Sequence, residues 1–273
     1  PRRQRQMCIR DSAETTSNAT TPQLDIRNGK ATIRLNRPAQ HNRLEPVDLR
    51  ELTRMFDELG RDPEVRVLII TASGKSFSSG FHIGALADDP EAAKDYDPEA
   101  FEKMVNALET MPTPTIASLN GGTYGGATDL ALACDFRIGV EGMRMFMPAA
   151  RLGIVYYQSG LRRYVTRLGL NAAKRLFLTA ETLEADELLQ IGFLTELVAA
   201  NELDARTDAL ASQIAANAPL AVAGNKLGLT AIACGTFDPD AHATIRKRSA
   251  ESEDHKEAVT AWAEKRRPVF KGR

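Results

Sequence analysis

The chain has 273 residues, of which 43% are hydrophobic and 26% are charged, a composition typical of a folded globular protein. Its 35 Lys and Arg residues against 36 Asp and Glu residues give a formal net charge of -1, which disfavours binding to nucleic acid or to an anionic membrane surface. No run of about 18 apolar residues is present, so we expect no membrane span. The three cysteines form no CxxC pair, which predicts a reducing, cytoplasmic setting and no cysteine-based metal site.

The chain divides into four predicted regions. Residues 1–12 resemble the translated sequence of a common sequencing-library adaptor, so we expect a non-native tail there. The polar residues 13–22 predict a disordered lead-in. We expect a folded core over 23–200 and a helical C-terminal region over 201–273. Without the tail, the remaining chain carries 31 basic and 35 acidic residues, a net charge of -4.

The pattern of apolar residues predicts a single α/β domain. Alternating apolar residues on both sides of Asn28-Gly29 predict a β-hairpin over 24–35, and helical spacing follows over 47–59, with Gly60 closing that helix. Further strands are expected at 65–70, 114–119, 136–140, 145–147 and 194–198, and further helices at 100–110, at 129–134 and from 161 onward. The strands are therefore used early, and the last third is helical.

Four glycines stand between the strand at 114–119 and the helix that follows it, at positions 121, 122, 125 and 126. Their spacing is G-G-x-x-G-G in mid-chain, which differs from the G-x-G-x-x-G of a dinucleotide site, so a nucleotide fold is disfavoured. Backbone N–H groups at the start of a helix favour an anion. Together with a second N–H from another loop, such a group can hold a developing oxyanion.

Four segments resemble the crotonase, or enoyl-CoA hydratase/isomerase, superfamily in order and spacing: LNRPAQHN (35–42), VLIITASGKSFSSGFHIGAL (67–86), NGGTYGGATDLALACDFRIG (120–139) and WAEKRRPVFKG (262–272). The resemblance covers residues 23–273. It implies an α/β fold of spiral β-β-α turns with a helical C-terminal trimerisation region, and hence a homotrimer or homohexamer. It also implies an acyl-CoA substrate whose thioester enolate is stabilised by an oxyanion hole.

The resemblance also assigns site residues. The two oxyanion amides would come from Phe81 and Gly126. Residues that match the acyl and pantetheine path or the CoA contacts are expected to bind substrate: His82, Ile83, Gly84, Gly125, Trp262 and Lys265. On sequence alone, each of three positions also has a structural explanation: a bond within its loop for His82, helix packing for Trp262 and a solvated surface charge for Lys265. No metal is expected, and no cofactor apart from the coenzyme A of the substrate.

The chain departs from the hydratases at their two glutamates, which position water and manage the proton at the α-carbon. The first falls on Asp129, one methylene shorter than Glu, which also fits a residue that complements the helix dipole. The second falls on Ala149. Asp129 is therefore the only carboxylate that we expect to transfer a proton, while Arg151, Arg162 and Arg163 are expected to be surface or intersubunit charges.

Two adjacent phenols, Tyr156 and Tyr157, replace a glycine-rich segment of the hydratases. Tyr157 resembles a tyrosine of the methylmalonyl-CoA decarboxylases, so it is a candidate catalytic group. Tyr156 is a candidate substrate contact, with packing in the core as the alternative. We expect first an enoyl-CoA hydratase/isomerase reaction. Decarboxylation of a malonyl-type CoA, thioester hydrolysis and a catalytically silent CoA-binding or assembly subunit stay open as alternatives.

Overall fold

Two β-sheets organise the computed structural model, which describes residues 21–82 and 97–273. The larger sheet has the order β1 (Gln23–Arg27), β2 (Lys30–Leu35), β3 (Val67–Ala72), β5 (Thr115–Leu119), β7 (Phe136–Val140) and β10 (Glu196–Val198). The smaller sheet has the order β4 (Ser76–Ser78), β6 (Gly122–Tyr124), β8 (Arg144–Phe146) and β9 (Leu183–Glu184). Strand β1 pairs antiparallel with β2, and β9 pairs antiparallel with β8. The other described strand pairs of both sheets are parallel.

Successive strands alternate between the two sheets, and a helix closes each turn. The turns are β3, β4 and α4 (Ala100–Thr110), then β5, β6 and α5 (Gly126–Ala133), then β7, β8 and α6 (Gln158–Leu168). The predicted spiral of β-β-α turns is therefore confirmed. Because each turn repeats the same path, the loops that leave β4, β6 and β8 come together at one end of the molecule.

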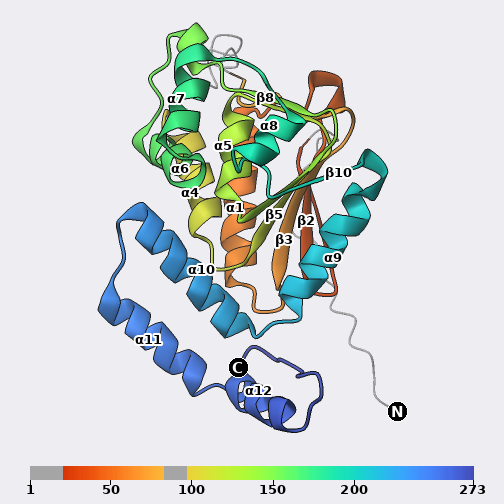
Figure 1. Cartoon of the computed structure of the whole chain (residues 1–273), viewed down its shortest axis with the longest axis vertical. Coiled ribbons are helices and arrows are strands. Elements are labelled where there is room, and N and C mark those ends of the chain that lie inside the picture. The colour runs from red at the N-terminus through yellow and green to blue at the C-terminus, as the bar shows by residue number, and fades with distance from the viewer. Residues whose placement is uncertain (1–20, 83–96) are drawn as a thin grey trace, which may run out of the picture.

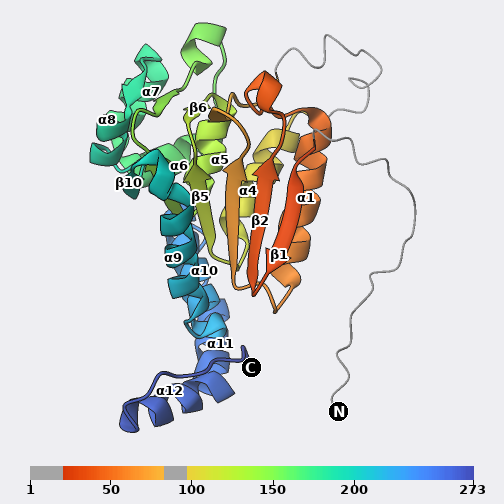
Figure 2. The same cartoon turned by 90° about the vertical axis from the view of Figure 1, so that its right-hand side faces the viewer.

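Helices lie on both faces of the larger sheet, but on one face they leave β1 and β2 uncovered (Figures 1 and 2). The helices α1 (Pro46–Arg61) and α4 lie on one side, and α9 (Leu203–Ala215) packs against β3, β5 and β7 on the other. All six residues of β3 are consequently buried, which explains why this strand reads as a nearly continuous apolar run. The predicted tail at 1–12, most of the lead-in, Ile83 and Gly84 lie outside the described residues.

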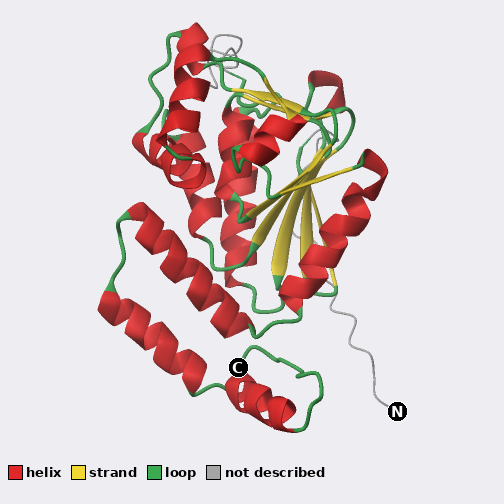
Figure 3. Cartoon of the chain, in the orientation of Figure 1, coloured by secondary structure: helices red, strands yellow, loops and turns green. Residues whose placement is uncertain are grey.

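The remaining helices form two groups. The first, α7 (Leu170–Thr179) and α8 (Ala185–Gln190), lies near the smaller sheet. The second, α10 (Pro219–Cys234), α11 (Pro239–Ala250) and α12 (Glu253–Ala263), extends below the sheets, as Figure 3 shows by colouring helices red. This second group leaves large apolar side chains exposed: Leu229, Ile232, Val259 and Trp262. None of the described helices is long and apolar enough to cross a membrane.

Most predicted elements are confirmed. The hairpin turns at Asn28 and Gly29, both with positive φ (52° and 74°), and the helix at 100–110 has the predicted bounds. The sequence did not predict β4, β6 and β9, which have only two or three residues and, unlike the equally short β8 and β10, were not recognised from their apolar residues. The prediction that Gly60 closes α1 is wrong by one residue. Gly60 lies inside this helix, which ends at Arg61, and the backbone becomes extended at Asp62.

Lys226 ties α10 to the core. Its side chain is 7% exposed, and its Nζ lies 2.8 Å from Asp135 Oδ2 and 2.7 Å from the Thr113 carbonyl oxygen. Asp135 also accepts a hydrogen bond from the Thr115 N–H. The pair therefore connects α10 to the strand β5 and to the loop before it.

Lys226→Ala should lower the free energy of unfolding by about 2 kcal/mol, less than the 3–5 kcal/mol of a fully buried pair because Asp135 keeps some contact with water. Lys247→Ala on α11 is the matched control, since that side chain is 74% exposed. It should change the free energy by no more than about 0.5 kcal/mol. Urea unfolding of the three proteins measures both effects, and equal losses in the two variants would contradict the assigned role of Lys226.

Candidate active site

A cavity of about 510 Å³ opens between α4, α5 and the segment that leads into α6. Its described wall is largely apolar, with Phe81, Phe101, Met147, Pro148, Ala149, Leu152, Ile154 and Val155. Polar side chains also reach it: Ser79, Glu99, Glu102, Tyr156 and Tyr157. The backbones of Gly125 and Gly126 complete one side. This combination of an apolar wall with a few polar groups is typical of a small-molecule site.

Two loop backbones meet at this cavity, after β4 and after β6. Gly126 is the first residue of α5, so its N–H has no acceptor within that helix. Gly80 has φ +88°, and a Cβ there would lie 2.8 Å from Gly126 N and 2.7 Å from the Tyr124 carbonyl oxygen. Only glycine permits this approach. The structure therefore brings together Phe81, which follows Gly80, and Gly126, the two residues expected to supply oxyanion amides.

Neighbouring contacts fix this arrangement. The Leu44 N–H donates to the Gly80 carbonyl oxygen, and the His82 N–H donates to the Leu44 carbonyl oxygen, both at 2.9 Å. On the other loop, Gly125 has φ 55° as the residue before α5. A Cβ on Gly126 would lie 2.6 Å from the ring of Phe101, so a larger residue there would displace α4 or α5.

The carboxylate of Asp129 lies behind the cavity wall and does not line the cavity. The residue is fully buried, and Arg163 Nη1 donates to its Oδ1 at 2.6 Å. Its Oδ2 accepts hydrogen bonds from the hydroxyls of Tyr157 and, at 3.3 Å, Tyr156. Tyr157 thus stands between Asp129 and the cavity. Whether Asp129 itself transfers a proton stays a prediction.

The two phenols stack on each other, with ring centroids 4.3 Å apart and an angle of 25° between the rings. Burial raises the pKa of Tyr157, and the adjacent charge of Asp129 raises it further. The same two causes raise the pKa of Tyr156. Both hydroxyls therefore remain protonated at neutral pH and can donate to Asp129. Tyr156 both lines the cavity and packs against the core, and its contact with substrate stays a prediction.

Arg163 corrects a sequence-based expectation, because it is fully buried and not a surface charge. It forms ion pairs with Asp129 and with Glu109, the latter at 3.0 Å, and donates to Asn106 Oδ1 at 2.8 Å. Helix α6 packs so that the side carrying Arg163 faces α4 and α5. No sequence pattern marks the pairing, since Asp129 and Glu109 lie 34 and 54 positions away in the chain.

Three further candidate residues lie away from the described cavity wall. His82 Nδ1 is 3.2 Å from Glu45 Oε2, a contact to the start of α1. Trp262 is 87% exposed on α12, and Lys265 follows the end of that helix. In Figures 1 and 2 this helix lies at the opposite end of the molecule from α5 and α6. A single chain therefore does not bring Trp262 or Lys265 to the cavity.

Two glutamates of the cavity wall were not predicted from the sequence. Glu99 and Glu102 lie where a polar stretch runs into α4, and neither belongs to a recognisable motif. Glu99 is 70% exposed and pairs with Lys103 at 3.2 Å. Glu102 is half-buried and accepts a hydrogen bond from Ser159 Oγ at 2.6 Å. The position of α4 in the fold brings Glu102, and Glu99 at the N-cap of that helix, to the wall of the cavity that also contains the two loop backbones.

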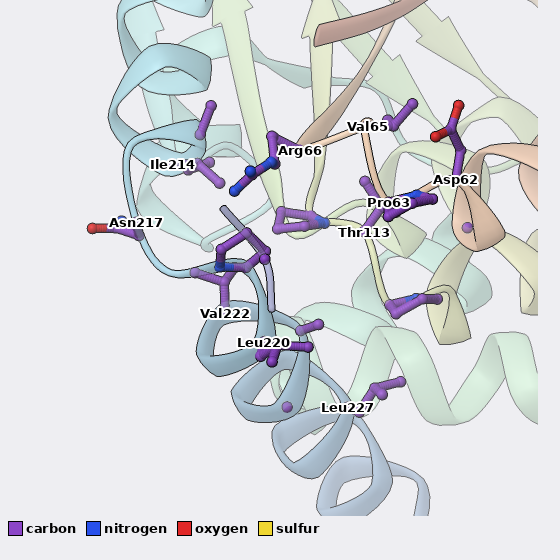
Figure 4. Close-up of a pocket in the computed structure, with 18 of the residues that line it drawn as sticks. Asp62, Pro63, Val65, Arg66, Thr113, Ile214, Asn217, Leu220, Val222 and Leu227 are labelled. Atoms are coloured by element: carbon purple, nitrogen blue, oxygen red, sulfur yellow. The ribbon is translucent and has the colours of Figure 1, made fainter. Parts of the chain in front are cut away.

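A second cavity, of about 380 Å³, lies at the other end of the sheet, where the loops before β3 and β5 meet α9 and α10 (Figure 4). Prolines and aliphatic side chains dominate it, and Arg66 donates to the Phe270 carbonyl oxygen at 3.4 Å. It contains neither loop amide. Across the described residues, no group of three or more His, Cys, Asp and Glu side chains could hold a metal ion. The first cavity is therefore the candidate active site.

The Arg163 network should make stability depend on pH through Glu109. Burial opposes ionisation of this carboxyl, but the hydrogen bonds and charges of Arg162 and Arg163 outweigh it and lower the pKa below the ordinary 4.5. A carboxyl with a lowered pKa in the folded state stabilises the protein above its unfolded pKa, and that contribution disappears as the pH falls.

Glu109→Gln should therefore cost about 2–3 kcal/mol of unfolding free energy at neutral pH, and the difference from the parent chain should shrink below pH 4.5. Urea unfolding at a series of pH values measures the difference. Glu264→Gln is the control, because that carboxyl is 56% exposed on the surface. A difference that does not change with pH would contradict the lowered pKa.

Comparison with known proteins agrees with this geometry. A sequence profile of the enoyl-CoA hydratase/isomerase family matches residues 25–273. The chain is 33% identical to a short-chain-enoyl-CoA hydratase of Clostridium acetobutylicum over 87% of its length and 92% of the relative's. It is 32% identical to a carnitinyl-CoA dehydratase of Citrobacter koseri over 88% of its length and 94% of the relative's.

The fold gives the same result. An enoyl-CoA hydratase/carnithine racemase from Magnetospirillum magneticum superposes with a TM-score of 0.85 at 28% identity, covering 93% of this chain and 96% of that one. The matched region includes both loops that meet at the cavity and the helices around it. The chain belongs to the enoyl-CoA hydratase/isomerase family, and it is an enzyme of that family.

Proposed function

We propose that this enzyme adds water to, or removes water from, the α and β carbons of an acyl-CoA thioester. The observation that carries the proposal is the meeting of the Phe81 and Gly126 backbones at the cavity. Their two N–H groups can hold the thioester oxygen as it becomes an enolate. Each such donor is worth about 3–4 kcal/mol in the transition state. Relatives named as a hydratase and a dehydratase, at 33% and 32% identity, support this reaction.

The charge of the cavity favours hydration over decarboxylation. Among the described residues, the wall carries the carboxylates Glu99 and Glu102 and no Lys, Arg or His. A malonyl-type substrate brings a further carboxylate, which Glu102 would repel, whereas Glu99 is paired with Lys103. An enoyl group is uncharged and fits the apolar wall. Tyr157 lines the cavity, but a phenol alone does not offset the negative charge of Glu102.

Asp129 has a role in this proposal through Tyr157. The phenol donates its proton to Asp129, so a lone pair of its oxygen is left to accept a hydrogen bond from water or substrate in the cavity. Arg163 balances the buried charge of Asp129. Asp129 then positions Tyr157, whereas direct proton transfer by Asp129 is the competing prediction.

We further propose a homotrimer or homohexamer built through α10, α11 and α12. The exposed apolar side chains of these helices support it, because an assembly would bury them. Trp262 and Lys265 would then approach the CoA of a neighbouring subunit. The reaction needs no metal or redox cofactor beyond the coenzyme A of the substrate. A cytoplasmic location agrees with the unpaired Cys134 and Cys234.

The reaction is tested with crotonyl-, 3-enoyl-, methylmalonyl- and saturated acyl-CoA in deuterated water, followed by mass spectrometry. We expect crotonyl-CoA to give a 3-hydroxyacyl-CoA with deuterium at the α-carbon. Loss of CO₂, double-bond migration without hydration, or release of free CoA would each assign another reaction. Binding of acyl-CoA without any turnover would identify a silent subunit. All four of these outcomes contradict the proposal.

The two roles of Asp129 are separated by Asp129→Asn, Tyr157→Phe and the double variant. If Asp129 acts through Tyr157, each single change should lower kcat about 10- to 100-fold, the effect of one hydrogen bond to a charged group. The double variant should then be no slower than either single variant. A direct proton transfer predicts that Asp129→Asn is much slower than Tyr157→Phe. Circular dichroism confirms that each variant is folded before rates are compared.

A further inference from the structure

Hydration needs a carboxylate that can reach water in the cavity. The oxygens of Asp129 accept hydrogen bonds from Arg163, Tyr156 and Tyr157, and the carboxylate lies behind the wall. Ala149 lines the cavity but carries no acid. Within the described part of the chain, a base for this reaction therefore has to come from another part of the wall.

Glu102 is a carboxylate on another part of that wall. It lines the cavity from α4, one residue after Phe101, whose ring lies 6.1 Å from the ring of Phe81 and 6.3 Å from that of Tyr157. The ring of Phe101 also fills the space beside Gly126. Because Phe101 contacts both loops, α4 is held against them, and Glu102 lies on the wall of the same cavity as the two amides.

The surroundings of Glu102 keep its carboxylate available. Ser159 Oγ donates to Oε1 at 2.6 Å, which orients the group toward the first turn of α6. With the described residues it forms no ion pair, whereas Glu109 and Asp129 pair with Arg163. Glu99, the other glutamate of the wall, is largely exposed and pairs with Lys103. Glu102 is thus the half-buried carboxylate that faces the cavity without a neutralising cation from the described chain.

We propose that Glu102 is the general base and acid of the hydration, an inference that rests on the proposed function. Its carboxylate takes one proton from water as the oxygen bonds to C3. The electron pair of the C2–C3 double bond moves toward the thioester oxygen, held by the N–H groups of Phe81 and Gly126. C2 then takes the proton from the Glu102 carboxylic acid. One water is consumed, and the carboxylate is restored.

This arrangement moves the acid across the cavity. The hydratases resembled by this chain carry their second glutamate at the position of Ala149, on the segment after β8. Here the wall formed by α4 supplies a carboxylate to the same space. The chemistry needs a carboxylate at the water, and a different element of the fold can place it there.

The test compares Glu102→Gln, Glu102→Asp, Glu99→Gln and Glu58→Gln with the parent chain, using the enoyl-CoA that the parent hydrates best. Glu58 is 57% exposed on α1 and is the matched control. We expect Glu102→Gln to lower kcat at least about 100-fold, the range of general acid–base catalysis. Glu102→Asp should keep part of the activity, and Glu99→Gln should lose less than Glu102→Gln. The Kd of a saturated acyl-CoA should stay nearly unchanged in Glu102→Gln.

Three results would overturn the role of Glu102 while leaving hydration itself intact: full activity in Glu102→Gln, equal losses in Glu99→Gln and Glu102→Gln, or weaker binding with an unchanged kcat. The second would indicate a general effect of cavity charge, and the third a binding residue. If the parent chain hydrates no enoyl-CoA, the proposed function fails first, and the role of Glu102 fails with it. Should Glu102→Gln not fold, Glu102→Asp decides, because full activity there would contradict a base of defined reach.

Discussion

The buried contact between Arg163 and Asp129 holds the candidate site together. Arg163 Nη1 on α6 lies 2.6 Å from Asp129 Oδ1 on α5, and both side chains are fully buried. Arg163 also forms an ion pair with Glu109, which connects α4 to the same two helices. A buried charge that loses its partner is costly, so these three helices keep one relative position. One end of α5 carries the amide of Gly126, and Tyr157 directly precedes α6. The pair thereby fixes the position of the phenol relative to the amide of Gly126.

A second constraint is the close approach of two loops. The backbone around Gly80 lies so near to Gly126 that a single added carbon would collide with it. Hydrogen bonds through Leu44 hold one loop, and the ring of Phe101 presses against the other. The ion pairs of Arg163 behind the cavity wall and the close approach of Gly80 and Gly126 within it have the same effect. Both hold backbone N–H groups rigid where charge develops in the reaction.

The chemistry of the cavity follows from which carboxylates face it. Asp129 has the sequence position of a catalytic acid, yet its oxygens are occupied by Arg163 and two phenols. Glu102 lacks any sequence signal, yet it lines the cavity. Burial and partners, more than residue type, decide what a carboxylate can do in a protein.

The sequence by itself determined the order of the elements and the two loops of the site. Apolar periodicity located the hairpin, β3 and α4, and the motifs around Phe81 and Gly126 indicated both the family and the loop amides, because these signals are local in the chain. Only the tertiary structure decided that Arg163 is buried, that Asp129 lies behind Tyr157, and that Glu102 faces the cavity. Each of these facts is a contact between helices whose residues lie tens of positions apart, and no local pattern encodes which sides of those helices meet.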